Sequence, residues 1–182
     1  MWIALAVVAA IVLWFVLTYN SFVKLRGFVQ EAFSGMDVYL KKRYDLIPNL
    51  VETVRRYMSH EEQTLTRIVE LRGIAAGAAT PQDKLAAEGE LSGAIGRLFA
   101  VAESYPQLMS SEQFISLQNE LTGVEDQIAQ ARKYYNGAVR QYNVKTQTIP
   151  SSLVAGICGF KAMPYFESSE QERQNVKVDF GQ

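Results

Sequence analysis

The N-terminal apolar run constrains the fold more than any other feature of the sequence. No charged side chain occurs in residues 1–23, and no polar residue interrupts residues 1–17. A run of this length is at the lower end of what spans a hydrocarbon core about 30 Å thick. Trp2 lies at one end and Trp14 and Tyr19 lie toward the other, where amphipathic rings favour the headgroup region. We therefore predict a transmembrane anchor over residues 1–23, with these three aromatic residues at the membrane interfaces.

Two other interpretations of this run are a cleaved signal peptide and a buried core helix. No Lys or Arg precedes the run, and no small-x-small cleavage site follows it at residues 18–21. The run is also apolar on every face and long for a core helix. Lys24 and Arg26 follow the span directly, so the positive-inside rule predicts a single-pass protein of the cell (inner) membrane. Its N-terminus is expected outside and the rest of the chain in the cytoplasm.

Three long helical stretches are predicted after the anchor, because apolar residues recur at intervals of three and four. The first runs from about Tyr19 to Arg72 and ends in the small-residue segment 73–79. Pro48 lies inside it. Proline has no N–H for the carbonyl of Tyr44, and its ring displaces that carbonyl, so we expect a kink or break between Tyr44 and Pro48.

Local signals mark the limits of the second helix. Thr80 is a capping residue followed by Pro81 at the first helical position, which indicates a helix start. The helix is expected to stop near Ser104, because Pro106 biases Tyr105 away from helical backbone.

The third helix is expected to open with a capping box from Ser110 to Gln113. Residues 114–142 then carry the most regular heptad pattern of the chain, which is typical of a bundle or coiled-coil seam. A short helix is predicted from Ser151-Ser152 to Gly156 or Gly159.

The predicted fold class is therefore all-α. One N-terminal transmembrane helix precedes an antiparallel bundle of three long helices plus a short C-terminal helix, over residues 24–166, because short connections favour antiparallel neighbours. Residues 167–182 are expected to form a polar tail, in which Val176, Val178 and Phe180 alternate in the manner of a short strand.

The sequence offers few groups for chemistry. The net charge is −1 and there is no basic arm, so we expect no nucleic-acid partner. The single cysteine, Cys158, excludes an internal disulfide, and it is interpreted as a packing residue. The single histidine, His60, begins a sequence like the zinc-protease HExxH motif, but Thr64 stands where the second histidine belongs. We predict no enzyme, no metal, no cofactor and no small-molecule substrate, with a hydrolase using His60 as the least favoured alternative.

The segment around Pro48 is the richest in polar side chains. One interpretation gathers Arg43, Tyr44, Asp45, Pro48 and Asn49 into an interaction surface at the proline. The structural interpretation instead pairs Arg43 and Asp45 with neighbouring helices and uses Asn49 to satisfy the displaced carbonyl.

A second polar feature flanks the heptad seam. Glu125 and Arg132 are one heptad apart and are predicted to set register, within the bundle or between chains.

Several stretches of the chain resemble the bacterial LemA family. The most specific is residues 40–51, LKKRYDLIPNLV, followed by His60-Glu61. Further matching stretches are Tyr19-Asn20, residues 97–106, residues 117–121, Ala131-Arg132 with Tyr135-Asn136, Pro150-Ser151, Gly159-Phe160 and Tyr165-Phe166. Val124 and Asp126 depart from the pattern, which has Thr and Asn there. The resemblance implies a single-span helical-bundle protein without an established activity or cofactor, and relatives associated with magnetosome membranes imply a part in membrane organisation.

These observations favour a membrane-surface scaffold. Its expected partners are the lipid bilayer and further copies of the chain, with an unidentified protein partner as a further interpretation. The alternative is an adaptor or sensor in which the bundle or the tail docks a specific enzyme or transporter.

Overall fold

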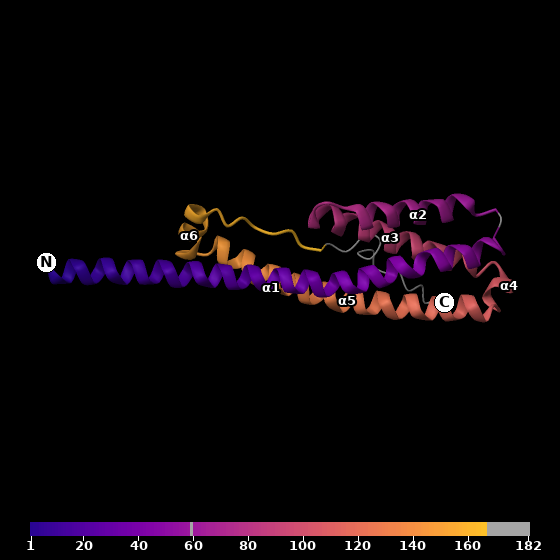
Figure 1. Ribbon diagram of the computed structural model, residues 1–182, viewed down its shortest axis with the longest axis horizontal. Coiled ribbons are helices and arrows are strands. Elements are labelled where there is room, and N and C mark those ends of the chain that lie inside the picture. Colours follow the sequence, from indigo (N-terminus) through magenta and orange to yellow (C-terminus); the bar gives the residue numbers. More distant parts are fainter. Residues whose placement is uncertain (59, 167–182) are drawn as a thin grey trace, which may run out of the picture. The chain divides into compact units, whose positions relative to one another are not determined.

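The computed structural model describes residues 1–58 and 60–166, and every regular element among them is a helix. The elements are α1 (Trp2–Arg55), α2 (Glu62–Gly77), α3 (Pro81–Ala102), α4 (Pro106–Met109), α5 (Glu112–Gln147) and α6 (Ser151–Cys158) (Figure 1). The predicted all-α class is confirmed for this part of the chain. The predicted strand at Val176, Val178 and Phe180 lies outside the described residues.

The chain forms two compact units. Unit 1 contains Met1–Asp37 and Ala129–Tyr165, and unit 2 contains Val38–Ile128 and Phe166. Helices α1 and α5 therefore contribute residues to both units. The limits predicted at residues 23 and 166, and the antiparallel three-helix arrangement, stay predictions.

The apolar start of α1 lies almost entirely on the surface of unit 1. Its most apolar 18-residue window has a mean hydropathy of 2.4, and only 6% of that window is buried. The first buried residue is Thr18, followed by Phe22. A core helix of the same composition would be mostly buried, so that interpretation does not fit. Helix α1 is long and apolar enough to cross a membrane.

The predicted extent of the first long helix is wrong. Instead of one helix to Arg72, α1 ends at Arg55 and α2 begins at Glu62. Of the kink or break expected between Tyr44 and Pro48, the break is excluded, because α1 continues through Pro48. The amides of Tyr57 and Met58 both donate to the Val54 carbonyl, at 2.9 and 3.0 Å, and Met58 is buried. This turn contains neither Gly nor Pro, and its one sign in the sequence is that residues 59–64 carry no apolar side chain. At the other end, α2 includes most of the predicted linker 73–79.

The start of α3 follows the local signals. Thr80 Oγ1 accepts a hydrogen bond from the Asp83 amide at 3.1 Å, and Pro81 is the first helical residue. Helix α3 ends at Ala102, near the predicted stop. Both predicted limits of this helix are confirmed.

The predicted cap of α5 is displaced by one residue. The Phe114 amide donates to Ser111 Oγ at 3.4 Å, whereas Ser110 Oγ donates to the Gln107 carbonyl at 3.0 Å. Ser110 therefore caps the end of the preceding short helix α4, which was not predicted from the sequence. Ser111 caps the start of α5.

Helix α6 ends at Gly159, one of the two predicted ends. Gly159 has φ 72°, the left-handed region that glycine adopts without a Cβ penalty. The Phe160 amide then donates to the Ala155 carbonyl at 2.9 Å, which closes the helix.

Each unit has its own apolar core. In unit 2, α2 and α3 lie side by side (Figure 1), and the core includes Ile47, Leu50, Val54, Leu65, Ile68, Leu91, Ile95, Phe114 and Leu121. In unit 1 the core includes Phe22, Val29, Met36, Tyr135, Val139, Tyr142 and Val154.

Candidate functional site

The core of unit 2 contains a polar cluster built by three helices. Arg43 of α1 and Glu88 of α3 are both fully buried and form an ion pair. Arg43 Nη1 also lies 2.6 Å from Ser92 Oγ of α3 and 2.6 Å from Glu125 Oε1 of α5. The Tyr44 hydroxyl donates to Glu88, and Ser92 Oγ lies 3.3 Å from Glu125 Oε2. One guanidinium thus connects α1, α3 and α5.

The residue types suit this arrangement. A guanidinium is planar and presents five donors, so it can serve two carboxylates and a hydroxyl at once. Two carboxylates face one cation, and Glu125 keeps 30% of its side chain exposed while Glu88 is enclosed. Burying such charges is costly unless each one is paired, and here each carboxylate faces the Arg43 guanidinium.

The carbonyl displaced by Pro48 finds a donor on α2. Arg72 Nε donates to the Tyr44 carbonyl at 2.6 Å. Pro48 and Arg72 also line the same groove of about 250 Å³. A side chain from a neighbouring helix therefore replaces the backbone N–H that proline lacks, and α1 continues as a helix through this point.

A double-mutant cycle tests this replacement. Arg72→Met is expected to lower the free energy of unfolding by about 1–3 kcal/mol, because the Tyr44 carbonyl loses its donor. In a Pro48→Ala chain the backbone amide restored at this position can donate to that carbonyl, so the same Arg72→Met change should cost less. Denaturant unfolding of the four proteins, followed by circular dichroism, measures the difference. Equal costs in both backgrounds would show that Arg72 does not serve the proline.

The structure divides the candidate interaction surface. Arg43 and Tyr44 point into the core, whereas Asp45, Pro48 and Asn49 are exposed. The five residues therefore do not share one exposed surface. Pairing of Arg43 with neighbouring helices agrees with the structural interpretation, but Asn49 does not satisfy the displaced carbonyl. An interaction role for the three exposed residues stays a prediction.

The other candidate residues fall in both units. Glu125 contacts Arg43 and Ser92 in unit 2, and Arg132 is half-buried in unit 1. Their role in setting register stays a prediction. Trp2 is 82% exposed, and Trp14 and Tyr19 are also exposed, as residues facing lipid would be.

Unit 1 contains an aromatic cluster where α1 meets α5. The Phe22 ring stacks on Phe160 with centroids 4.8 Å apart and meets Tyr142 edge-on at 6.1 Å. The Lys145 ammonium lies 5.5 Å from the Phe22 ring centroid and donates to Ser21 Oγ. Burial raises the pKa of the Tyr142 hydroxyl, and nearby Arg26 partly opposes this shift.

Two α5 side chains hold the segment that follows α6. The Asn143 amide donates to the Met163 carbonyl at 2.9 Å and accepts from the Met163 amide at 2.8 Å. The Tyr135 hydroxyl donates to the Pro164 carbonyl at 2.9 Å, and burial raises the pKa of this hydroxyl. Asn143 directly follows Tyr142, the last residue of the heptad seam, and no sequence signal indicated that it binds this segment.

The Tyr135 hydroxyl is expected to make stability depend on alkaline pH. Its folded-state pKa is raised above the ordinary value of 10.0, so the folded chain holds this proton more tightly than the unfolded chain. The stabilisation is therefore present below pH 10 and is lost as the pH rises through the folded-state pKa. Tyr135→Phe should reduce this alkaline loss. An unchanged pH profile of the unfolding free energy would contradict the assignment.

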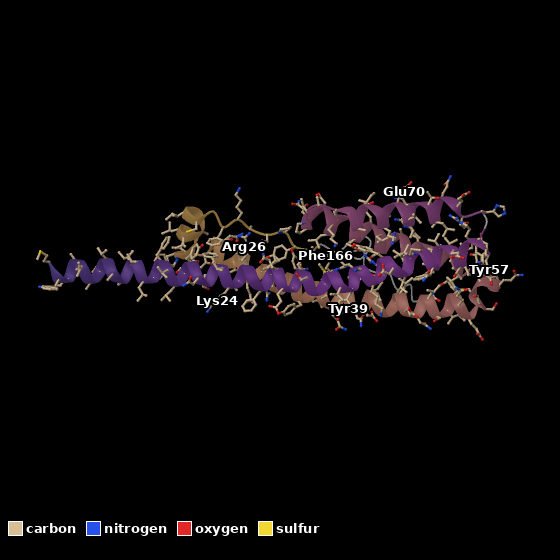
Figure 2. The ribbon with its side chains drawn as sticks, viewed as in Figure 1. Lys24, Arg26, Tyr39, Tyr57, Glu70 and Phe166 are labelled. Atoms are coloured by element: carbon tan, nitrogen blue, oxygen red, sulfur yellow. The ribbon has the colours of Figure 1, made fainter. Side chains whose placement is uncertain are left out.

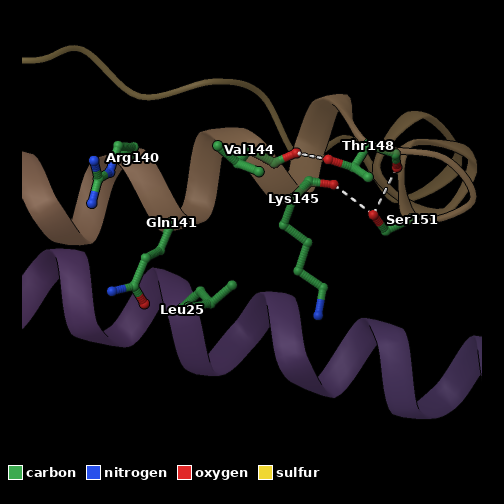
Figure 3. A pocket seen from close by; sticks show the side chains of 7 residues that line it. All are labelled: Leu25, Arg140, Gln141, Val144, Lys145, Thr148 and Ser151. Atoms are coloured by element: carbon green, nitrogen blue, oxygen red, sulfur yellow. Dashed lines mark hydrogen bonds between the residues drawn. The ribbon is translucent and has the colours of Figure 1, made fainter.

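An open groove of about 500 Å³ lies between α1 and the end of α5 in unit 1 (Figure 3). It is lined by Leu25, Arg140, Gln141, Val144, Lys145, Thr148 and Ser151. Ser151 Oγ lies 2.8 Å from the carbonyl oxygens of both Lys145 and Thr148, which share its single hydroxyl proton at the turn into α6. The basic residues of the groove suit an anionic group.

Three residues of the polar sites were missed from the sequence. Glu88 lies three residues from both Leu85 and Leu91 on the apolar stripe of α3, and a carboxylate in that position signals a buried partner. Ser92 and Arg72 carried no comparable signal. Among the described residues, no group of three or more His, Cys, Asp or Glu side chains is arranged to hold a metal ion.

Most of the chain matches the model of a known protein family. The model of the LemA family matches residues 32–180. The chain belongs to the LemA family. This confirms the resemblance that residues 40–51 carry, and it places the buried cluster of Arg43, Glu88 and Glu125 inside the region that defines the family.

Named relatives of this LemA-family chain come from several bacteria. Magnetosome protein MamQ 2 of Paramagnetospirillum magneticum is 28% identical over 88% of this chain and 68% of its own length. Magnetosome protein MamQ of Magnetospirillum gryphiswaldense is 27% identical over 81% of this chain and 64% of its own length. Protein LemA of Metamycoplasma hominis is 24% identical over 86% of this chain and 72% of its own length. None of these names denotes an enzyme.

Proposed function

We propose that this LemA-family protein is a single-pass, membrane-anchored scaffold without enzymatic activity. The first turns of α1 span the cell (inner) membrane, with the N-terminus outside and the helical units in the cytoplasm. The observation that carries the proposal is the exposure of the apolar start of α1, of which only 6% is buried in its most apolar window. A continuous apolar surface of that length requires a hydrophobic partner, and lipid provides one.

The placement of polar groups supports a structural role over a catalytic one. The charges that converge in unit 2 are directed at one another across three helices, as Arg43 is to Glu88 and Glu125. This geometry suits holding helices together. The carboxylate oxygens of Glu88 and Glu125 that face Arg43 are paired with its guanidinium. The MamQ names of two relatives refer to magnetosomes, which is consistent with work at a membrane.

Self-association is the proposed means of assembly. Large apolar side chains remain exposed beyond the span, including Phe28 and Tyr134 in unit 1 and Val38, Ile74 and Ile115 in unit 2. Exposed aromatic side chains are frequent anchors of protein interfaces. Tyr134, with 61% of its surface exposed, is the best placed of these to report contact between copies.

Site-specific crosslinking in native membranes tests this proposal. Tyr134→Cys in a Cys158→Ser chain is expected to give crosslinked homodimers with a short thiol crosslinker. Gln147→Cys, an exposed polar position on the same helix that lies about 140° around its axis from Tyr134, is the matched control and should give few. Equal yields at both positions would indicate random collision and contradict self-association. A heterologous product at Tyr134 would instead favour an adaptor that docks a specific partner.

A further inference from the structure

Helix α6 presents an apolar edge that no described residue of unit 1 covers. Leu153 and Ile157 lie one turn apart on α6 and are 62% and 75% exposed, and Ile149, two residues before the helix begins, is 80% exposed. The opposite side of the helix, with Val154 and Ala155, is buried against unit 1. The helix is therefore apolar on both faces, although only one face has a partner within the described part of the chain.

The sequence around α6 is free of charge for an unusual length. No Asp, Glu, Lys or Arg occurs in residues 146–160, and Lys145 and Lys161 bound this segment on either side. A helix facing water usually carries charged side chains on its exposed face. Apolar segments flanked by lysines are typical of membrane interfaces, where the long side chains extend toward the headgroups.

Helix α6 lies beside α1 at the level where the apolar run ends (Figure 1). Phe160, which follows α6, contacts Tyr19 at 5.6 Å and Phe22 at 4.8 Å between ring centroids. The uninterrupted apolar run stops at residue 17, and Thr18 is the first buried residue of α1. If the span crosses a bilayer, α6 consequently meets the boundary between acyl chains and headgroups.

The charge around α6 is of one sign. Of the 18 basic and 19 acidic residues in the chain, five basic residues and no acidic residue fall in residues 1–30 and 138–165. Lys24 and Arg26 project from α1 just beyond the apolar run (Figure 2), and Arg140 and Lys145 line the groove beside them. Clustered cations next to a span are attracted to the anionic lipids of a leaflet.

We propose that α6 is a second membrane contact, an interfacial helix that places Leu153 and Ile157, together with Ile149 just before it, at the acyl–headgroup boundary of a bilayer containing anionic lipid. The basic residues around it bind the lipid phosphates. This inference rests on the proposed membrane anchor, because α1 sets the depth of α6. A lipid surface is favoured over a second copy of the chain, because Phe160 just after α6 contacts α1 just beyond its exposed apolar run and the surrounding charge is uniformly positive.

Depth-dependent quenching in vesicles tests the proposal on the full chain. An environment-sensitive fluorophore is attached at Ile157→Cys in a Cys158→Ser chain, reconstituted in vesicles of phosphatidylcholine and phosphatidylglycerol. Lipids with a nitroxide near the headgroup should remove most of its fluorescence, and lipids with a nitroxide near the chain end should remove less. Omitting phosphatidylglycerol should weaken the quenching. Circular dichroism verifies that the labelled chains keep their helix content.

Two further label positions separate the proposal from the one it rests on. A label at Val8→Cys should be quenched by the deep nitroxide, and a label at Gln130→Cys should escape both. Quenching at Val8 together with an unquenched Ile157 would overturn the interfacial helix and leave the anchor intact. An unquenched Val8 would overturn the anchor itself. A shifted emission at Ile157 without quenching would mean that protein covers α6, and quenching independent of phosphatidylglycerol would overturn the anionic-lipid contact.

Discussion

Replacing Arg43 by methionine is expected to lower the free energy of unfolding by about 3–5 kcal/mol, because one partner of a buried ion pair is removed. Glu88 would stay enclosed without its cation, since it is fully buried and pairs with Arg43. Ser92 and Glu125 would lose a donor that lies 2.6 Å from each. Denaturant unfolding in detergent, followed by helical circular dichroism, measures the loss.

Two variants make the Arg43 experiment specific. Arg56→Ala removes the exposed Arg56–Glu52 pair, in which nitrogen and oxygen lie 2.8 Å apart, and should cost less than about 1 kcal/mol. Adding Glu88→Gln to Arg43→Met removes the enclosed charge and keeps an acceptor for the Tyr44 hydroxyl, so it should recover much of the loss. If Arg43→Met cost no more than Arg56→Ala, the buried cluster would not be what fixes the register of α1, α3 and α5.

Local signals predicted those elements whose ends are decided by neighbouring residues. The start of α3 at Thr80-Pro81 and the end of α6 at Gly159 both depend on hydrogen bonds within a few positions of the chain. Such bonds depend on residue type and spacing, which a sequence displays directly. The all-α class followed from apolar spacing for the same reason.

Sequence signals did not predict the local structure where residues far apart in the chain determine it. Nothing near Pro48 shows that Arg72 will supply the missing donor, so the sequence left a kink and a break equally open where α1 continues as a helix. The turn between α1 and α2 depends on the burial of Met58 and on two amides that share the Val54 carbonyl. Apolar spacing indicates helix on both sides of this turn, and the polar residues 59–64 between them do not by themselves distinguish a turn from an exposed stretch of helix.

The burial of Arg43 follows from its place on the core face of α1. Leu40, Ile47 and Leu50 are fully buried, and Arg43 lies between them at helical spacing. A charged residue in a motif then indicates a buried partner, and Glu88 on the stripe of α3 matches it.

The second prediction with a large expected effect concerns the proposed transmembrane span at the start of α1. Arginine near the centre of a transmembrane helix costs about 2.5–3.5 kcal/mol on insertion. Val8 and Val12 are 60% and 56% exposed and lie near the middle of the apolar run. The double change to arginine should therefore move much of the protein from the alkaline-resistant membrane fraction to the soluble fraction.

Controls distinguish loss of the anchor from loss of the fold. Changing Val8 and Val12 to leucine should leave the protein in the membrane, because the span keeps its apolar surface. The helical signal of units 1 and 2 should survive in the arginine variant, since neither position contributes to the buried cores. Intact mass of the wild-type protein should include residues 1–23, and a mature chain lacking them would identify the run as a cleaved leader. Unchanged membrane retention of the arginine variant would mean that the span is not what holds this protein at the bilayer.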